Sequence, residues 1–249
     1  MSGHSKWHNI KIRKQAQDKQ KSKIFGKLSR EIITAAREGG GDPDSNARLR
    51  TALDRARQGG MPQESVKRAI QRGTGETEGV AFESAVYEGY GPGGVAILVE
   101  VLTDNRNRVV SELRRVFTRN GGNLAESNAV AWLFERKGVV LVPVEKASED
   151  AVMETALEAG AEDMQTDDTS YEIRTEPAGL DDVKKALDTA NIGYDSAEVT
   201  MLPQTRVTLG EKEAQQVLRL MDALEDLDDV QQVYANFDIP DQIMEAVAA

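Results

Sequence analysis

The chain has 249 residues, of which 39% are hydrophobic and only 5% aromatic. It is longer than a typical single domain of roughly 100–150 residues, so two or three domains with aliphatic cores are expected. The absence of cysteine excludes disulfides, thiolate catalysis, zinc fingers and iron–sulfur clusters. No apolar run approaches the roughly 20 residues that span a bilayer, and no apolar leader follows Met1, so we expect a cytoplasmic protein without a membrane partner.

The formal charge of −11 is divided unevenly along the chain. Residues 1–75 carry 17 Lys and Arg against 7 Asp and Glu, a net +10, whereas residues 76–249 carry 14 against 35, a net −21. A basic lobe at one end of an acidic chain is typical of a protein that binds a polyanion. The alternative is that the two lobes neutralise each other within one molecule, and both interpretations can hold together. The glycine-rich "RGTGETEGVAF" between them predicts a hinge.

Residues 1–22 have few large apolar residues and many basic ones, which predicts an extended or mobile arm that becomes ordered on its partner. Trp7 lies between Lys6 and Lys11 and is suited to stack on a base. It is equally suited to anchor the arm on the protein body.

Three short amphipathic helices are predicted after the arm. Residues 23–37 place Phe25, Leu28, Ile32, Ala35 and Ala36 in one apolar arc, with Lys23, Lys27, Arg30 and Arg37 on the opposite side. "GGGDPDSN" ends this helix and offers Asp42, Asp44 or Ser45 as a cap for the next, which covers residues 45–58 and projects Arg48, Arg50, Arg55 and Arg57 outward. A third helix follows Pro62. Together they predict a small bundle with a basic surface.

The periodicity then changes to that of an α/β chain. Strands are predicted over "GVAILVEVLTD" and "AVAWLFERK", with a helix over "NRNRVVSELRRVFTRNGG" between them. Residues 138–203 follow the order βαββαβ, which is ferredoxin-like. The last segment adds "TRVTL", a helix from residue 211 and a strand over "VQQVYANFDIP".

The predicted fold class is therefore α+β and multidomain, with an N-terminal three-helix domain followed by two α/β ferredoxin-like domains, one inserted in the other. The expected domains are a basic domain with its arm at 1–78, a discontinuous α/β domain at 79–137 plus 204–249, and an inserted domain at 138–203.

The residues contain no credible catalytic set. "GYGPGG" matches G-x-G-x-x-G, but Pro92 interrupts it and a strand follows, so a hairpin-like loop is predicted instead of a dinucleotide site. His4 and His8 are the only histidines and have no neighbouring ligands for a metal. Adjacent acids such as Asp228 and Asp229 diverge too far to form a site alone. We expect a protein that is not an enzyme, with no cofactor, no metal and no small-molecule substrate.

Several long motifs resemble the YebC/PmpR family. They include "GHSKWHNIKIRKQAQDKQKSKIFGKLSREI", "GGGDPDSNARLRTALDRAR", "MPQESVKRAIQRGTG", "YEGYGPGGVAILVEVLTDNRNRVVSELR" and "GGNLAESNAVAWLFERKG", in this order over residues 2–138. The resemblance implies a helical domain and two α/β domains. It also implies a role in gene expression, either as a DNA-binding transcriptional regulator or as a ribosome-associated factor that helps synthesis through proline-rich stretches.

The sequence thus predicts a nucleic-acid-binding regulator whose partner is DNA, with ribosomal RNA as the alternative and a protein-interaction module as a further one. None of the candidate residues is expected to read bases specifically, because phosphate contacts position a protein without reading sequence. The candidates for backbone contact are Lys6, Lys11, Arg13, Lys14, Lys19, Lys21, Lys23, Lys27 and Arg30, with Trp7 for stacking and Arg48, Arg55 and Arg57 as a secondary patch.

Overall fold

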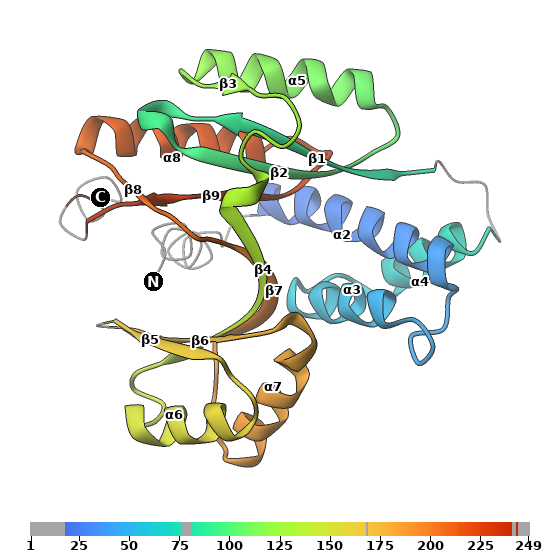
Figure 1. Ribbon diagram of the computed structural model, residues 1–249. Coiled ribbons are helices and arrows are strands. Elements are labelled where there is room, and N and C mark those ends of the chain that lie inside the picture. Colours follow the sequence, from blue (N-terminus) through green and yellow to red (C-terminus); the bar gives the residue numbers. More distant parts are fainter. Residues whose placement is uncertain (1–17, 76–80, 168, 241–242, 244–249) are drawn as a thin grey trace.

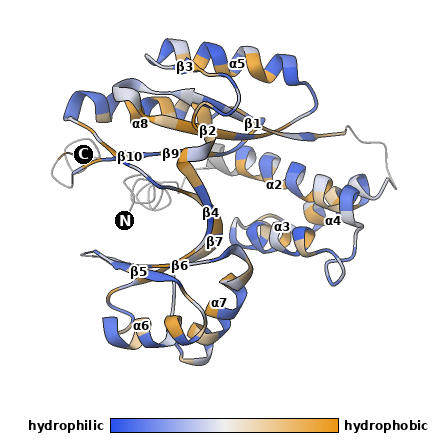
Figure 2. Cartoon of the chain, viewed as in Figure 1, coloured by the Kyte–Doolittle hydropathy of each residue, from blue (hydrophilic) through white to orange (hydrophobic). Residues whose placement is uncertain are grey.

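The computed structural model describes residues 18–75, 81–167, 169–240 and 243, with side chains from residue 22 onward. The fold class is α+β and multidomain, as predicted. Three described helices precede two units in which helices cover a sheet (Figure 1). Apolar residues concentrate between these layers, as Figure 2 shows.

The N-terminal helices are α2 (Asp18–Gly39), α3 (Ala47–Gln58) and α4 (Gln63–Gly73). The predicted apolar arc is confirmed at Ile32, Ala35 and Ala36, which are at most 1% exposed and pack with residues of α3 and α4. Helix α2 begins five residues before the predicted start at residue 23, so residues 18–22 are helical and the predicted extended arm is wrong for them.

The N-cap of α3 is Asn46, so the prediction of Asp42, Asp44 or Ser45 as the cap is wrong. Asn46 also connects α3 to α2. Its side-chain oxygen accepts the backbone N–H of Leu49 at 3.0 Å, and its amide nitrogen donates to the carbonyls of Ala35 and Gly40 at 2.8 Å each. An amide can accept and donate at once, whereas an ionised aspartate only accepts. One buried side chain therefore begins α3 and holds it against the end of α2.

The first α/β unit has a sheet of strand order β3–β1–β2–β9. Its strands are β1 (Glu83–Tyr90), β2 (Ala96–Thr103), β3 (Asn123–Leu124) and β9 (Val230–Ala235). Helices α5 (Arg106–Arg119) and α8 (Glu211–Glu225) cover one face, where Ile97, Leu113, Phe117 and Leu220 are fully buried. The N-terminal helices lie on the other side of this sheet (Figure 1). Residues far apart in the sequence thus share one core.

The hairpin predicted at "GYGPGG" is confirmed. Strands β1 and β2 pair in antiparallel fashion up to Tyr90 and Ala96, and a short 3-10 turn, η1 (Pro92–Gly94), closes the loop. Gly93 and Gly94 have φ of 73° and 77°, in the left-handed region that favours glycine. Gly93 and Gly94 therefore provide the left-handed backbone conformations that the turn requires.

The second α/β unit has the strand order β5–β6–β4–β7, the arrangement of a ferredoxin-like βαββαβ unit. Its elements are β4 (Phe134–Pro143), α6 (Glu149–Glu158), β5 (Asp163–Thr166), β6 (Ser170–Thr175), a 3-10 turn η3 (Pro177–Gly179), α7 (Leu180–Thr189) and β7 (Ser196–Pro203). Both helices pack on one face over Val140, Ile173, Val183 and Leu187.

The prediction of two separate strands at 129–137 and 138–144 is wrong. Residues 131–133 form a 3-10 turn, η2 (Ala131–Leu133), and β4 then runs unbroken through the expected boundary at 137/138. Strand β7 pairs with β4 from Phe134 to Leu141, so the backbone groups across the boundary are satisfied. Gly138 is needed for close packing, because a Cβ there would lie 2.7 Å from the Thr175 side chain. The long β4–β7 ribbon joins the two units (Figure 1).

The strand predicted over residues 230–240 is divided in two. β9 ends at Ala235, and β10 (Phe237–Asp238) pairs in parallel with β8 (Val207–Thr208). Between them, the buried side chain of Asn236 accepts the backbone N–H of Ala96 at 2.8 Å. This contact replaces a ladder hydrogen bond and lets the chain leave the sheet.

Candidate nucleic-acid interface

Much of the predicted arm lies outside the described residues. This applies to Lys6, Trp7, Lys11, Arg13 and Lys14. Their contacts with nucleic acid stay a prediction. The described backbone places Lys19 and Lys21 in the first turns of α2.

The cationic side of α2 faces an acidic loop, which we define as residues 225–229 at the end of α8. The Lys23 ammonium lies 3.1 Å from the Asp226 carboxylate, and the Lys27 ammonium donates to the Glu225 carbonyl at 2.6 Å. The last carbonyls of a helix lack intrahelical partners and carry partial negative charge, so they favour cations. These two lysines therefore complete the C-terminal end of α8.

Arg30 makes the third contact between α2 and the acidic loop. It donates to the Asp228 carbonyl, and its guanidinium lies 3.5 Å from the Asp229 carboxylate and over the Phe82 ring, 5.7 Å from the ring centroid. Three of the predicted phosphate ligands are thus engaged within the molecule. This supports the alternative that the basic and acidic lobes neutralise each other at this face.

Asp229 connects the helices to the sheet. Its side chain is only 3% exposed and accepts from the Thr103 hydroxyl at 2.9 Å and from Arg108 at 2.6 Å. The hydrogen bond with Asp229, followed by the one with Asp104, raises the pKa of Arg108 above its usual value. One buried carboxylate therefore holds arginines from α2 and α5 together.

The secondary patch on α3 is divided between surface and interior pairs. Arg48 pairs with Glu38, and Arg57 pairs with Asp54 at 3.1 Å while remaining 82% exposed. Exposed pairs of this kind contribute little, typically below about 1 kcal/mol, so a phosphate can displace them.

Arg55 differs from the other two patch residues. Its guanidinium lies 3.0 Å from Glu31 of α2 and 4.0 Å from Glu198 of β7. Burial opposes the charged form, but these two carboxylates outweigh it and raise the pKa of Arg55. Arg55 therefore holds the helices against the β4–β7 ribbon.

Two exposed aromatic residues were missed by the sequence analysis. Trp132 is 67% exposed and Tyr90 is 36% exposed, and both donate to the carbonyl of Ala129 at 3.2 Å. Exposed aromatic rings offer stacking surfaces to unpaired bases. The signal in the sequence was a single Trp inside a predicted strand, where burial was the ordinary expectation.

Glu88 builds the loop that presents these rings. Its carboxylate is 6% exposed and accepts the backbone N–H groups of Asn128, Val130 and Ala131 at 2.6, 2.7 and 2.8 Å. Burial alone would raise the pKa of Glu88, but these hydrogen bonds, with that of Val130 first, outweigh it and lower the pKa. Asn128 adopts φ of 68°, which aims the backbone at the carboxylate.

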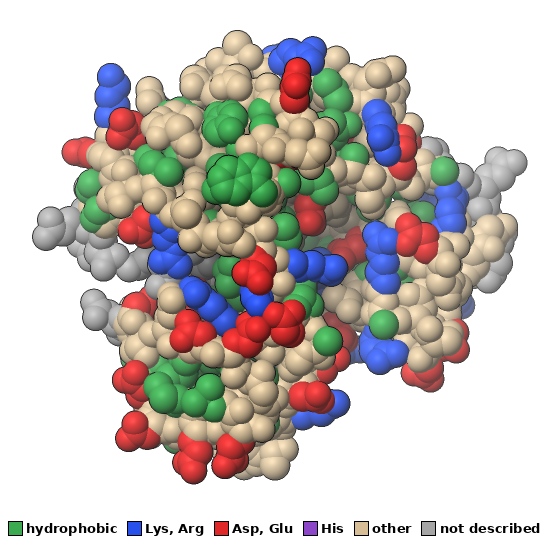
Figure 3. Space-filling view, viewed as in Figure 1, with side chains coloured by type: hydrophobic (Ala, Val, Ile, Leu, Met, Phe, Trp, Pro, Cys, Tyr) green, Lys and Arg blue, Asp and Glu red, His purple; other side chains and the backbone are tan. Residues whose placement is uncertain are grey.

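The described part of the chain holds no group of three acidic or metal-ligating side chains that suits a metal ion. His4 and His8 lie outside it. No helix within the described ranges is long and apolar enough to cross a membrane. Figure 3 shows basic and acidic side chains interleaved where the upper and lower parts of the molecule meet.

The chain is similar to known proteins along its whole length. Residues 5–76 match the family model described as the TACO1/YebC protein N-terminal domain, and residues 82–237 match the TACO1/YebC second and third domain. A protein of Persephonella marina named "probable transcriptional regulatory protein" is 54% identical over the full length of both chains, and one of Syntrophobacter fumaroxidans with the same name is 53% identical over both full lengths. The crystal structure of a conserved hypothetical protein from Aquifex aeolicus is 50% identical, with a TM-score of 0.80 over 90% of this chain and 93% of the other.

Proposed function

Because this chain belongs to the TACO1/YebC family, we propose that it regulates gene expression by binding nucleic acid through the phosphodiester backbone, without catalysing a reaction. The name of its relatives, "probable transcriptional regulatory protein", supports transcription as the regulated step, and DNA is the target that we propose for that step. The observation that carries the proposal is the net +10 on residues 1–75 of a chain whose total charge is −11. Among the described residues of this basic lobe, Lys23, Lys27 and Arg30 contact the acidic loop through the bonds described above.

The arm supplies the proposed first contact with DNA. If the basic lobe neutralises six to eight phosphates, log K falls with log salt at a slope of roughly −5 to −7 on B-form DNA. The candidates on the arm are Lys6, Lys11, Arg13 and Lys14, and the exposed Arg48 and Arg57 add weaker contacts because their carboxylate partners are readily displaced.

Neutralising the arm tests the proposal. We expect the arm variant Lys6→Gln/Lys11→Gln/Lys14→Gln to bind a labelled DNA duplex with a slope shallower by about 3, since each lost phosphate contact removes about 0.9. Every duplex sequence should weaken about equally, because these groups carry no base information. Fluorescence anisotropy over a salt series measures both quantities.

The matched control removes three positive charges from the second α/β unit instead. This lysine control, Lys146→Gln/Lys184→Gln/Lys185→Gln, alters exposed or half-buried side chains. Lys184 and Lys185 pair with Asp181 and Asp182 on their own helix. It should retain the slope of the unaltered protein. If the arm variant and the lysine control behave alike, the arm does not bind DNA.

A second candidate function is supported by the exposed aromatic pair. Sequence-specific RNA recognition commonly stacks splayed bases on aromatic side chains, whereas paired bases in a DNA duplex are not available for stacking. Trp132 and Tyr90 therefore favour ribosomal RNA as a partner, with the translation role that the sequence resemblance implies.

Removing the indole separates these two functions. We expect Trp132→Ala to weaken binding to a single-stranded RNA by about 10-fold, because stacking contributes roughly 1–3 kcal/mol per base, and to leave duplex DNA binding unchanged. Stability should change by less than about 0.5 kcal/mol since the side chain is exposed. The control is Leu157→Ala, which truncates another exposed apolar side chain, on α6. Equal RNA affinity for Trp132→Ala and the unaltered protein would show that Trp132 does not stack on the RNA. Co-sedimentation of both proteins with ribosomes would measure the effect of the substitution on ribosome binding.

A further inference from the structure

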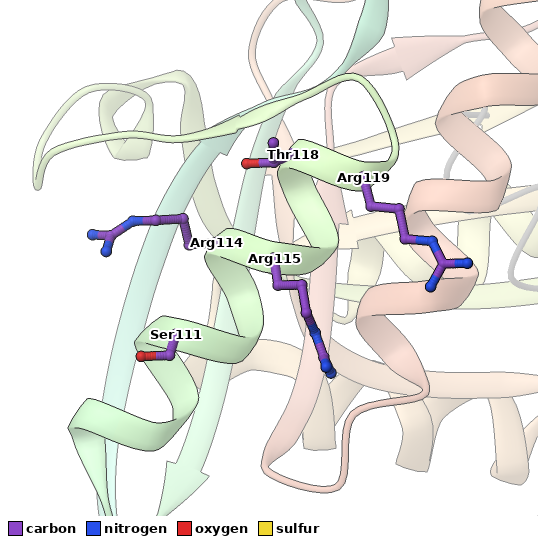
Figure 4. Close-up of a pocket in the computed structure, with 5 residues that line it drawn as sticks. All are labelled: Ser111, Arg114, Arg115, Thr118 and Arg119. Carbon is purple, nitrogen blue, oxygen red and sulfur yellow. The ribbon is translucent and has the colours of Figure 1, made fainter.

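The acidic part of the chain carries a cluster of arginines that the sequence analysis did not select. We call Arg114, Arg115 and Arg119 of α5 and Arg219 of α8 the arginine surface. Arg114, Arg115 and Arg119 line a shallow hollow with Ser111 and Thr118 (Figure 4). An adjoining hollow between the two helices is lined by Arg115, Arg119, Arg219, Val116, Asn120 and Ala223.

These arginines have no acidic partner in the described part of the chain. All four are exposed, no carboxylate there lies within 4.0 Å of their guanidinium groups, and no carboxylate lines either hollow. The arginines at the start of the same helix behave differently, because Arg106 pairs with Glu83 at 2.8 Å and Arg108 with Asp229 at 2.6 Å. Helix α5 therefore uses its first arginines for the fold and leaves its last ones unpaired.

Folding does not account for this arrangement. Arg115 and Arg119 are four residues apart on one helix, so they are neighbours on its surface, and like charges at this spacing destabilise a helix. The helix dipole favours a cation in the last turn, which explains Arg119. It does not explain why α8 brings Arg219 to the same hollow. An external anion that bridges the two helices does explain it.

The chemistry of the lining fits phosphate groups on an extended polymer. Guanidinium groups donate in a fork that matches phosphate oxygens, and hydroxyl and amide side chains such as those of Ser111, Thr118 and Asn120 also donate to backbone phosphates. The hollow in Figure 4 is shallow and open and the adjoining one is partly open, which suits a backbone passing over the surface better than an enclosed small molecule. In Figure 4 Arg119 extends toward α8 while Arg114 extends away from it and Arg115 lies between them, so the charges are spread over the surface.

We propose that the arginine surface binds the phosphodiester backbone of a nucleic acid, as a second contact separate from that of the arm and the exposed arginines of α3. This inference rests on the proposed function. Helices α5 and α8 cover one face of their sheet and the described N-terminal helices lie on the other side (Figure 1), so the arginine surface and the exposed arginines of α3 engage different segments of nucleic acid. The body of the protein then takes part in binding despite its net negative charge.

The test is the variant Arg115→Gln/Arg119→Gln/Arg219→Gln in the full chain, compared with the lysine control. Anisotropy with a labelled DNA duplex should show an affinity lower by about 10-fold or more and a salt slope shallower by about 3, as for three lost phosphate contacts. The thermal midpoint should change little, because the substitution removes like-charge repulsion and also the favourable interaction of Arg119 with the helix dipole, and it removes no ion pair. The same titration with an RNA hairpin shows which nucleic acid the surface prefers, and loss on either one supports the proposal.

The outcomes are distinguishable from those of the arm variant. If the arm variant loses affinity but the arginine-surface variant changes the slope by less than about 1 on both probes, this inference fails and the proposed function stands. If only the arginine-surface variant loses affinity, the inference stands and the arm assignment fails. If the unaltered protein binds neither probe, both fail. A variant that keeps its nucleic-acid affinity but no longer binds a polyglutamate peptide would assign the surface to an acidic protein and overturn the proposal.

Discussion

Replacing Asp229 with alanine is expected to lower the free energy of unfolding by about 2 kcal/mol. Breaking a buried ion pair typically costs about 3–5 kcal/mol because the remaining charge loses its partner in a dry site. The side chains of Arg108 and Arg30 remain 44% and 23% exposed, so water solvates them after the substitution and the cost is smaller. The lost hydrogen bond from Thr103 adds about 1 kcal/mol to the cost.

Urea denaturation followed by circular dichroism measures this loss, and Asp226→Ala is the control. Asp226 belongs to the same acidic loop and pairs with Lys23, but its side chain is 75% exposed, so its removal should change stability by less than about 0.5 kcal/mol. Equal effects at the two positions would show that burial of Asp229 does not matter. A double-mutant cycle with Arg30→Gln then measures how much of the effect comes from the contact between α2 and the sheet.

Replacing Glu88 with glutamine is expected to cost about 2 kcal/mol at neutral pH. The carboxylate accepts three backbone N–H groups, and hydrogen bonds to a charged group contribute roughly 1.5–3 kcal/mol where they are buried. A glutamine side chain has only one oxygen that can accept these hydrogen bonds. Its NH₂ group is a donor and would face backbone N–H groups, with which it cannot form a hydrogen bond. The loop from Ala125 to Leu133 should therefore loosen and present Trp132 less rigidly.

The effect of this substitution depends on pH in a defined direction. The folded pKa of Glu88 is lowered, so its ionised form stabilises the protein fully above the unfolded pKa of about 4.3 and loses that contribution as pH falls through the folded value. The difference between Glu88→Gln and the unaltered protein should therefore be largest at neutral pH and should shrink below about pH 4. Denaturation curves at several pH values test this. Glu126→Gln, which alters an exposed carboxylate on the same loop, should show no such dependence.

Local patterns were sufficient to predict most elements. The arc of Ile32, Ala35 and Ala36 indicated a helix and is buried, because the 3.6-residue repeat that places these residues on one face is a property of the helix itself. The order βαββαβ likewise indicated the ferredoxin-like unit, whose strand order the structure shows. The break expected at Gly138 did not occur, because the pairing of β4 with β7 and the packing against Thr175 involve residues distant in the sequence.

The candidate site was harder to predict than the fold, and charge is the reason. The basic excess of residues 1–75 could be counted, and so could the acidic excess of the rest. Counting does not show which cation has a partner. Lys23 meets Asp226, 203 residues further along the chain, while the arginine surface was hidden within a segment of net charge −21.

The sequence by itself determined the helices, the alternating strands, the overall charge asymmetry and the family resemblance, because each depends on residues close together in the chain or on composition alone. Only the tertiary structure decided that the α2 cations complete α8, that Glu88 shapes the loop bearing Trp132, and that Arg219 joins the arginines of α5. Electrostatic and hydrogen-bond partners act over a few ångströms in space, and the packing of the sheets determines which distant residues come within that range.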